Sequence, residues 1–263
     1  MTISLGPEKK TENCMVCSGK LDYLNEAVSM LCTYCGKEQQ GHVKCPQGHF
    51  VCDACHGKDA RKFIEELTLS SKSLDPLAIA EIMMAHPVLP MLSCDHAYIA
   101  AGALLAALRN SPYGSKIGEA EIGEAFARTA KQAHGGYCGL TGVCGVAPAI
   151  GACFSIFLGA RCGSDREQKI VMEAVTRVSR AITDLTGPSC CKAYVRASLG
   201  VAVDIFAEKF GVVLPVKDAV ITCKHSAQHP HGCREERCPY FKKPTGDIFA
   251  GKTFVPGTAA CVT

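Results

Sequence analysis

Eight potential metal ligands lie in four closely spaced pairs near the N-terminus. The pairs follow one another as Cys14-x2-Cys17, Cys32-x2-Cys35, Cys45-x3-His49 and Cys52-x2-Cys55. A gap of two or three residues in a tight turn lets both side chains of a pair bind one tetrahedral ion, with zinc–sulfur distances of about 2.3 Å. The spacing therefore predicts two zinc ions. Four protein ligands close each site, so we expect no catalysis there.

The pairing of these ligands is open. Sequential use joins the first pair with the second and the third with the fourth, whereas a cross-brace joins alternate pairs. His56 is an alternative to Cys55, or a neighbour that orients a ligand. Gly36 directly follows Cys35 and tolerates the positive φ of a tight turn. Segment 14–57 has few apolar residues, so it needs the ions as staples in order to fold.

A second thiol motif, HGGYCGLTGVCG, spans residues 134–145 and carries Cys138 and Cys144. Glycine permits close approach of the backbone to a bound group. Backbone N–H groups at the start of the following helix favour a thiolate or an anion. The motif fits an iron–sulfur cluster, a substrate thiolate or an anionic ligand. Tight packing of small residues is the structural alternative.

Two further thiol groups lie towards the C-terminus. Cys190 and Cys191 are adjacent, so we expect one to be a ligand or nucleophile and the other to be core; Lys192 beside them favours a lowered thiol pKa. The second group has three cysteines and three histidines: Cys223, His225, His229, His231, Cys233 and Cys238. This set suits a third zinc site, or the end of a loop that binds an iron–sulfur cluster. A solvated polar loop is the alternative for that segment.

These motifs define the candidate residues for chemistry. Three catalytic candidates are thiols that would hold a cluster in which one iron is free to bind substrate: Cys138, Cys144 and Cys190. Two more would move protons: Lys192 and His134. The candidate cofactor ligands are six thiols: Cys138, Cys144, Cys190, Cys223, Cys233 and Cys238. We predict that Cys153 and Cys162 are buried small hydrophobes.

Hydrophobic periodicity predicts a mainly α-helical, bundle-like domain that holds these thiols. Helices are expected over 58–71, 75–86, 95–109, 116–132 (preceded by Gly114-Ser115), 146–160, 165–186 and 191–210, and a short strand within 212–222. Asp75 followed by Pro76 is a strong helix start. The predicted organisation is a zinc-binding module (14–57), a connecting helix (58–73), a helical cysteine-rich domain (74–241) and an extended tail (242–263).

Composition limits the function classes. The chain has 263 residues, 18 of them cysteine, and a net charge of +3 without a dense basic stripe, so nucleic-acid binding is not indicated. The N-terminus lacks the apolar segment of a secretory signal, and we expect a cytoplasmic protein that uses its thiols for metals or catalysis. Residues 135–160 carry no charge, but the first ten are glycine-rich and suit a loop, and the apolar run of about 16 residues that remains is short for a membrane span, which favours a buried core helix.

The chain resembles an uncharacterised domain-of-unknown-function family of anaerobic bacteria and archaea, some of whose members are fused to methyltransferases. The resemblance lies in CPQGHFVCDACH (45–56), HPVLPM (86–91), GGYCGLTGVCG (135–145), SCCK (189–192) and the Cys233/Cys238-Pro239 ending. Relatives carry more charged or His-rich residues after the HPxxPM segment, whereas this chain reads LSCDHAY. The resemblance therefore does not imply a ligand role for His96. The resemblance implies metal binding.

Three functions follow as hypotheses. The first is an iron–sulfur or thiolate-dependent enzyme of sulfur or one-carbon chemistry in an anaerobe. The second is a non-enzymatic, zinc-stabilised partner of a methyltransferase or redox protein. The third, an electron carrier, ranks last because the large domain lacks the compact C-x2-C-x2-C run of ferredoxin-like carriers.

Overall fold

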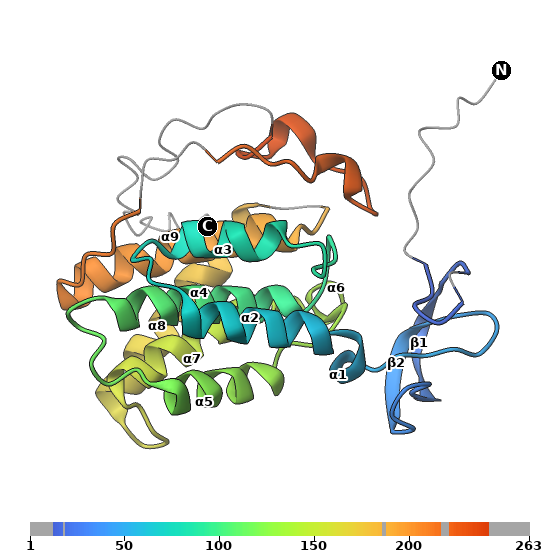
Figure 1. Ribbon diagram of the computed structural model, residues 1–263, viewed down its shortest axis with the longest axis horizontal. Coiled ribbons are helices and arrows are strands. Elements are labelled where there is room, and N and C mark those ends of the chain that lie inside the picture. The colour runs from blue at the N-terminus through green and yellow to red at the C-terminus, as the bar shows by residue number, and fades with distance from the viewer. Residues whose placement is uncertain (1–12, 18, 186–187, 217–220, 242–263) are drawn as a thin grey trace, which may run out of the picture.

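A small hairpin module stands at one end of a larger helical body in the computed structural model of the chain (Figure 1). The structure describes residues 13–17, 19–185, 188–216 and 221–241. The predicted extended tail, 242–263, lies outside these residues. The mainly helical fold class, with a cysteine-rich module at the N-terminus, is confirmed.

The module is built on an antiparallel hairpin of β1 (Asp22–Leu31) and β2 (Glu38–Lys44), with Leu31 opposite Glu38 near the turn. No strand was predicted here. Neither strand has a buried residue, so the hairpin has no apolar core of its own. In this module the buried hydrophobic residues are cysteines: Cys14, Cys32, Cys45 and Cys52. The thiols therefore occupy the interior that apolar side chains occupy elsewhere.

The helical body forms its seven long helices where periodicity predicted helices. Its α-helices are α1 (Asp53–His56), α2 (Lys58–Ser70), α3 (Pro76–Ala85), α4 (Asp95–Asn110), α5 (Glu119–Ala130), α6 (Tyr137–Thr141), α7 (Val146–Leu158), α8 (Asp165–Asp184) and α9 (Cys191–Phe210). The short α1 and α6 were not predicted. Two short 3-10 turns follow, η1 (Ser226–Gln228) and η2 (Glu235–Arg237). Asp75 caps α3 as predicted, because its Oδ1 accepts from the N–H groups of Leu77 and Ala78.

Helix α4 is the centre of the core. Every residue from Asp95 to Leu108 is buried, and α2, α3, α5, α7 and α9 pack around it. Its run of Ala, Gly and Leu has no polar face, so the helix can be covered on all sides. Its first turn lies at the end of the body that faces the hairpin module, where Arg61 of α2 pairs with Asp95.

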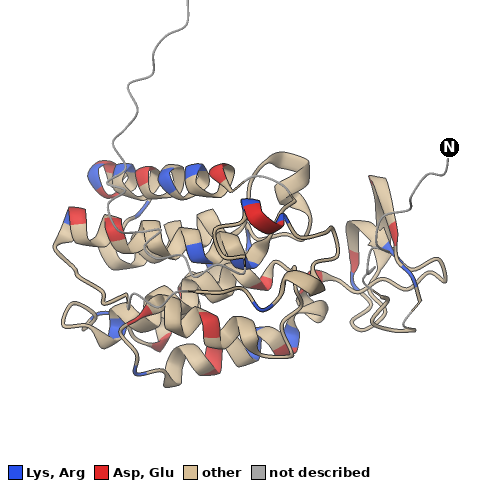
Figure 2. Ribbon diagram, turned by 90° about the horizontal axis from the view of Figure 1, so that it is seen from above, with Lys and Arg blue, Asp and Glu red and all other residues tan. Residues whose placement is uncertain are grey.

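The uncharged segment forms α7, a buried core helix as expected. Of the helices in the described part, none has the length and apolar character to span a bilayer. Lys and Arg alternate with Asp and Glu over the helices in Figure 2, without a one-sign stripe.

Three local expectations differ from the structure. Helix α5 begins at Glu119 rather than directly after Ser115, because Glu121 accepts from the Gly118 N–H at 2.9 Å and caps the helix there. Residues 211–216 and 221–222 form no strand, although Val212 and Leu214 pack into the core. Cys153 is buried as predicted, but Cys162 is exposed.

Candidate metal centres

Two sets of four ligand atoms meet in the hairpin module. One set is Cys14, Cys17, Cys45 and His49; the other is Cys32, Cys35, Cys52 and Cys55. Within each set all ligand atoms lie within 4.8 Å of one another. The alternate pairs are joined, so the arrangement is a cross-brace, and Cys55 rather than His56 completes the second set.

The spacing within each set fits a tetrahedral ion. Cys17 Sγ lies 3.5 Å from Cys45 Sγ, and Cys14 Sγ lies 3.8 Å from His49 Nδ1. In the second set Cys35 Sγ lies 3.7 Å from Cys52 Sγ. Four sulfurs at zinc–sulfur bond length from one ion are about 3.8 Å apart. The residues present therefore fit one zinc-sized ion in each set.

Backbone N–H groups favour the thiolate form of the first cysteine in a pair. The N–H of Val16 points to Cys14 Sγ, and that of Cys52 to Cys32 Sγ, each at 3.4 Å. Burial opposes ionisation of Cys32, but the N–H groups of Cys52, Cys35 and Tyr34 outweigh it and lower its pKa to about 6. The same balance lowers the pKa of Cys14 to about 7.

The hairpin explains the cross-brace. Cys32 and Cys35 lie in the turn between β1 and β2, while the pair at Cys14 and the pair at Cys45 lie at the opposite end. Gly36 has φ +66°, as its place after Cys35 predicted. A two-stranded ribbon separates its ends, so each end collects its own four ligands.

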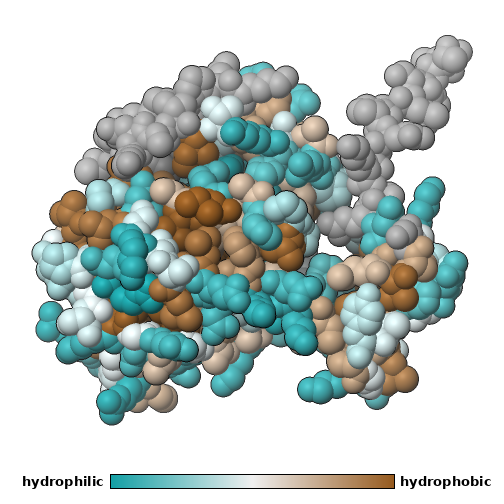
Figure 3. Space-filling view, viewed as in Figure 1, coloured by the Kyte–Doolittle hydropathy of each residue, from teal (hydrophilic) through white to brown (hydrophobic). Residues whose placement is uncertain are grey.

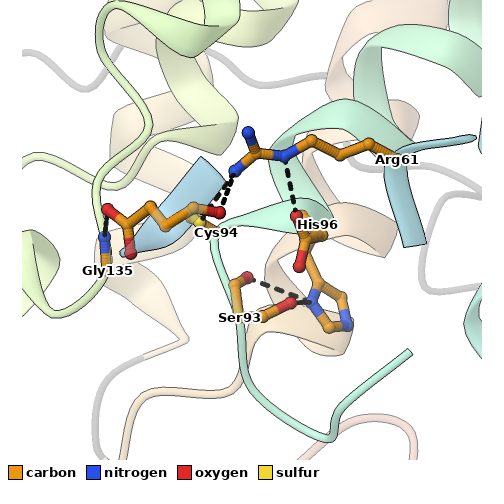
Figure 4. Close-up of polar contacts among 7 residues, drawn as sticks. Arg61, Ser93, Cys94, His96 and Gly135 are labelled. Carbon is orange, nitrogen blue, oxygen red and sulfur yellow. Dashed lines mark hydrogen bonds and ion pairs between the residues drawn. The ribbon is translucent and has the colours of Figure 1, made fainter. Parts of the chain in front are cut away.

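Arg61 connects the second ligand set to the helical body (Figure 4). Its Nη2 donates to the carbonyl of Asp53, which lies between the ligands Cys52 and Cys55, at 3.0 Å. Its Nε pairs with the buried Asp95 at 3.1 Å. Asp53 Oδ2 in turn accepts from the N–H of Gly135 at 3.5 Å, at the start of the glycine-rich thiol loop.

The six candidate cofactor thiols divide into two groups at the start of α9. Cys190, Cys223, Cys233 and Cys238 line one pocket. Cys138, Cys144 and Cys191 do not line this pocket; burial raises the pKa of Cys191, and the nearby Cys144 and Cys138 act in the same direction. The adjacent thiols of Cys190 and Cys191 thus belong to different groups.

The predicted trio Cys138, Cys144 and Cys190 is not gathered around one ion-sized position. In the described residues, the only sets of three or more ligand atoms within 4.8 Å are the two in the hairpin module. The predicted third zinc site at residues 223–238 is likewise not formed at that spacing. Burial raises the pKa of Cys144 to about 11, against the N–H of Val146.

Lys192 is almost wholly buried, and its Nζ donates to the carbonyl of Met84 at 2.8 Å. Burial lowers its pKa to about 8. Burial also raises the pKa of both neighbouring thiols, Cys190 and Cys191, so the expected lowering of a thiol pKa beside Lys192 is outweighed. His134 is exposed, and its Nε2 lies 3.2 Å from the carbonyl of Lys131.

His96 is a polar core residue that the candidate set omitted. It is 1% exposed, its Nδ1 lies 3.1 Å from the carbonyl of Ser93, and its Nε2 has no partner in the described part of the chain. Burial, followed by the charge of Lys192, lowers its pKa to about 3. The ring is therefore neutral, with Nδ1–H donated to Ser93 and a free lone pair on Nε2. From the sequence, the place of His96 on an apolar helix suited either a satisfied core residue or a general base or ligand that faces the Cys138 loop.

The family model described as Family of unknown function (DUF5714) matches residues 64–241. That range includes the HPVLPM, GGYCGLTGVCG and SCCK segments and the Cys233/Cys238-Pro239 ending, whereas segment 45–56 precedes it. No curated protein and no solved structure matches the chain.

Proposed function

The chain belongs to this family of unknown function, and we propose that it is an iron–sulfur or thiolate-dependent enzyme of sulfur or one-carbon chemistry in an anaerobe. The observation that carries the proposal is the convergence of thiols from three separate segments at the start of α9. In an enzyme of the cytoplasm, such thiols stay reduced and available for chemistry.

The roles divide between the module and the helical body. The module holds two structural zinc ions and, through Asp53 and Arg61, fixes the start of the glycine-rich loop. Cys190 in one thiol group, and Cys138 and Cys144 in the other, serve a bound group or the substrate. Lys192 and His134 are the proton carriers of the proposal; of these, the buried Lys192 is beside the thiols.

Anaerobic purification followed by zinc, iron and sulfide analysis tests the proposal, together with timed alkylation of each cysteine read by mass spectrometry. Exposed Cys162 is the reference for a free thiol. We expect bound iron and sulfide, or a thiol of the helical body that reacts faster than Cys162. A chain with zinc alone, whose helical-body thiols all react no faster than Cys162, contradicts the proposal.

A second candidate function is a non-enzymatic partner of a methyltransferase or redox protein. It is favoured by large apolar side chains on the surface of the module, among them Met15 (50% exposed), Tyr34 (55%) and Leu31 (66%). Figure 3 shows apolar patches on this module between hydrophilic ones. Exposed apolar side chains grouped on a small surface are typical of protein contacts.

A surface variant tests this second function. Tyr34→Glu changes an exposed side chain outside the ligand sets, so both zinc ions should remain. If the module is a docking face, the variant loses a methyltransferase or redox protein that the unaltered chain captures from an anaerobic extract. Capture of the same protein at the same level by both chains contradicts it.

A further inference from the structure

We propose that Cys190, Cys223, Cys233 and Cys238 together hold an iron–sulfur cluster beside the start of α9, an assignment that rests on the proposed function and specifies its ligands. The four thiols line one pocket, which Met91 and Phe241 border as apolar side chains. A thiolate set with an apolar border is the usual environment of such clusters.

The separation of the thiols favours a cluster over a single ion. One tetrahedral ion requires its ligand atoms to be about 3.8 Å apart, as in the hairpin module. No three of these four thiols come within 4.8 Å of one another, although all four are described and face the same pocket. A cluster places an iron–sulfide core between its four cysteines, so its ligands stand farther apart than those of one ion.

The backbone around the pocket thiols repeats the turn seen at the zinc ligands. In the module, the N–H groups of Val16 and Gln47 point to the sulfur two residues earlier, at 3.4 Å. The N–H of His225 points to Cys223 Sγ at 3.4 Å, and that of Glu235 to Cys233 Sγ at 3.3 Å. Hydrogen bonds of this kind stabilise a thiolate ligand and tune the potential of a cluster.

The other two pocket thiols accept backbone N–H groups as well. Ala193 donates to Cys190 and Tyr240 to Cys238. The loop is closed by the N–H of Cys223, which donates to the carbonyl of Tyr240 at 2.7 Å. The ligand-bearing backbone is therefore tied together by its own hydrogen bonds.

Of the nearby histidines, the one that lines the pocket is already engaged. His229 Nε2 lies 3.0 Å from the carbonyl of Ser189, and its Nδ1 accepts from the N–H of His231 at 3.3 Å. A ring with one nitrogen donating and the other accepting has no lone pair left for a metal. The pocket thus offers thiols, and an all-cysteine set is what common clusters use.

Buried cationic side chains line the proposed site or lie near Cys190. Arg234 is 5% exposed and donates through Nη2 to the carbonyl of Pro188 at 3.1 Å. Lys192 donates to the carbonyl of Met84. A neutral carbonyl does not cancel a buried charge, whereas a cluster with four thiolate ligands carries net negative charge. Arg196, the third buried cation, pairs with Glu81 at 2.6 and 2.8 Å.

Anaerobic reconstitution of the full chain with ferrous iron and sulfide tests the assignment. Cys233→Ser/Cys238→Ser should lose most of the bound iron and sulfide and the visible absorption of the cluster. The matched control, Cys138→Ser/Cys144→Ser, should keep them. Helical circular dichroism and the count of zinc, unchanged in both variants, verify that the chains are folded.

Two results would overturn the assignment. One is that Cys233→Ser/Cys238→Ser still binds iron and sulfide whereas the control variant does not. The proposed function then stands with a different set of ligands. The other is a third zinc ion, without iron or sulfide, that requires the same four thiols. The proposed function itself fails only if the chain binds zinc without iron or sulfide and all helical-body thiols also react no faster than Cys162.

Discussion

Arg61 is the residue at which the metal module and the helical body meet. It is 25% exposed at the side chain and compensates the charge of Asp95, which is 1% exposed. Arg61→Met would leave that carboxylate buried and unpaired. We expect the free energy of unfolding to fall by roughly 2–3 kcal/mol, somewhat below the loss for a fully buried pair.

Urea denaturation of the zinc-loaded chain measures this loss. Lys62→Met is the matched control, because the Lys62–Glu66 pair of the same helix is 77% and 67% exposed at its side chains. An exposed pair of this kind contributes about 0.3–0.5 kcal/mol. Equal effects of the two variants would mean that Arg61 does not support Asp95.

The lowered pKa of the buried His96 should make the free energy of unfolding depend on pH. Its pKa is about 3 in the folded protein and 6.5 as the ordinary value. Between these values the unfolded chain binds a proton that the folded chain does not, so stability falls as the pH falls below 6.5. From pH 6.5 to about pH 5 the loss is about 1.5 kcal/mol.

Comparison with His96→Gln isolates this contribution, since protonation of the zinc ligands affects both chains alike. The difference in free energy of unfolding between the two chains should change by that amount across the interval. Parallel pH profiles would contradict a neutral, buried His96.

At the residue scale, the spacing in the sequence indicated the eight potential metal ligands that the structure gathers, but left their pairing open. The spacing of Cys14, Cys17 and the later pairs is a local property, readable without the fold. The choice between sequential and cross-braced use depends on which end of the hairpin each pair reaches. Likewise the adjacency of Cys190 and Cys191 was visible, but the division of their thiols between two groups depends on the packing around α9.

At the element scale, α2 and α4 approach so closely that one glycine is required between them. A Cβ on Gly102 would lie 2.3 Å from Thr68 Oγ1, with Phe126 next nearest at 3.3 Å. Gly102→Ala should therefore lower the free energy of unfolding by about 1–3 kcal/mol through overpacking. Chemical denaturation of the full chain measures it.

Gly123 of α5 is the matched control, because a Cβ there meets nothing within 4 Å. Gly123→Ala should be neutral or stabilise the chain by up to about 1 kcal/mol, as alanine is the better helix former. If the Gly102→Ala and Gly123→Ala chains were equally stable, α2 would be able to move away from α4 at little cost, and the expected overpacking would be wrong.

The helices were predictable because apolar periodicity and capping depend on residues that are close together in the sequence, such as Asp75 and Pro76. The hairpin was not, because β1 has no regular apolar alternation and its register is irregular between Tyr23 and Val28. A ribbon held by metal ligands needs no such pattern. Helix α5 starts at Glu119 because Glu121 caps the N–H of Gly118, a contact that the sequence alone did not predict.

At the scale of the whole molecule, the two parts have different sources of stability. The body has a core around α4, whereas the hairpin has thiols in place of a core. Removal of zinc by a chelator should unfold the hairpin and leave most of the helical signal, because structural zinc supplies roughly 10–16 kcal/mol to folds of this kind.

Amide hydrogen exchange with and without chelator distinguishes the two parts. Protection should be lost over 19–50 and kept in α4. Loss of helical circular dichroism at the same chelator concentration would mean that the body depends on the metal as much as the hairpin does.

The most direct test of the cross-brace is the zinc count of Cys14→Ser/Cys45→Ser by native mass spectrometry of the full chain. These cysteines belong to one ligand set, so the variant should bind one zinc where the unaltered chain binds two. Cys14→Ser/Cys32→Ser, which removes one ligand from each set, should weaken both sites. If instead Cys14→Ser/Cys45→Ser weakens both sites and Cys14→Ser/Cys32→Ser retains one intact zinc, the pairing is sequential and the cross-brace is wrong.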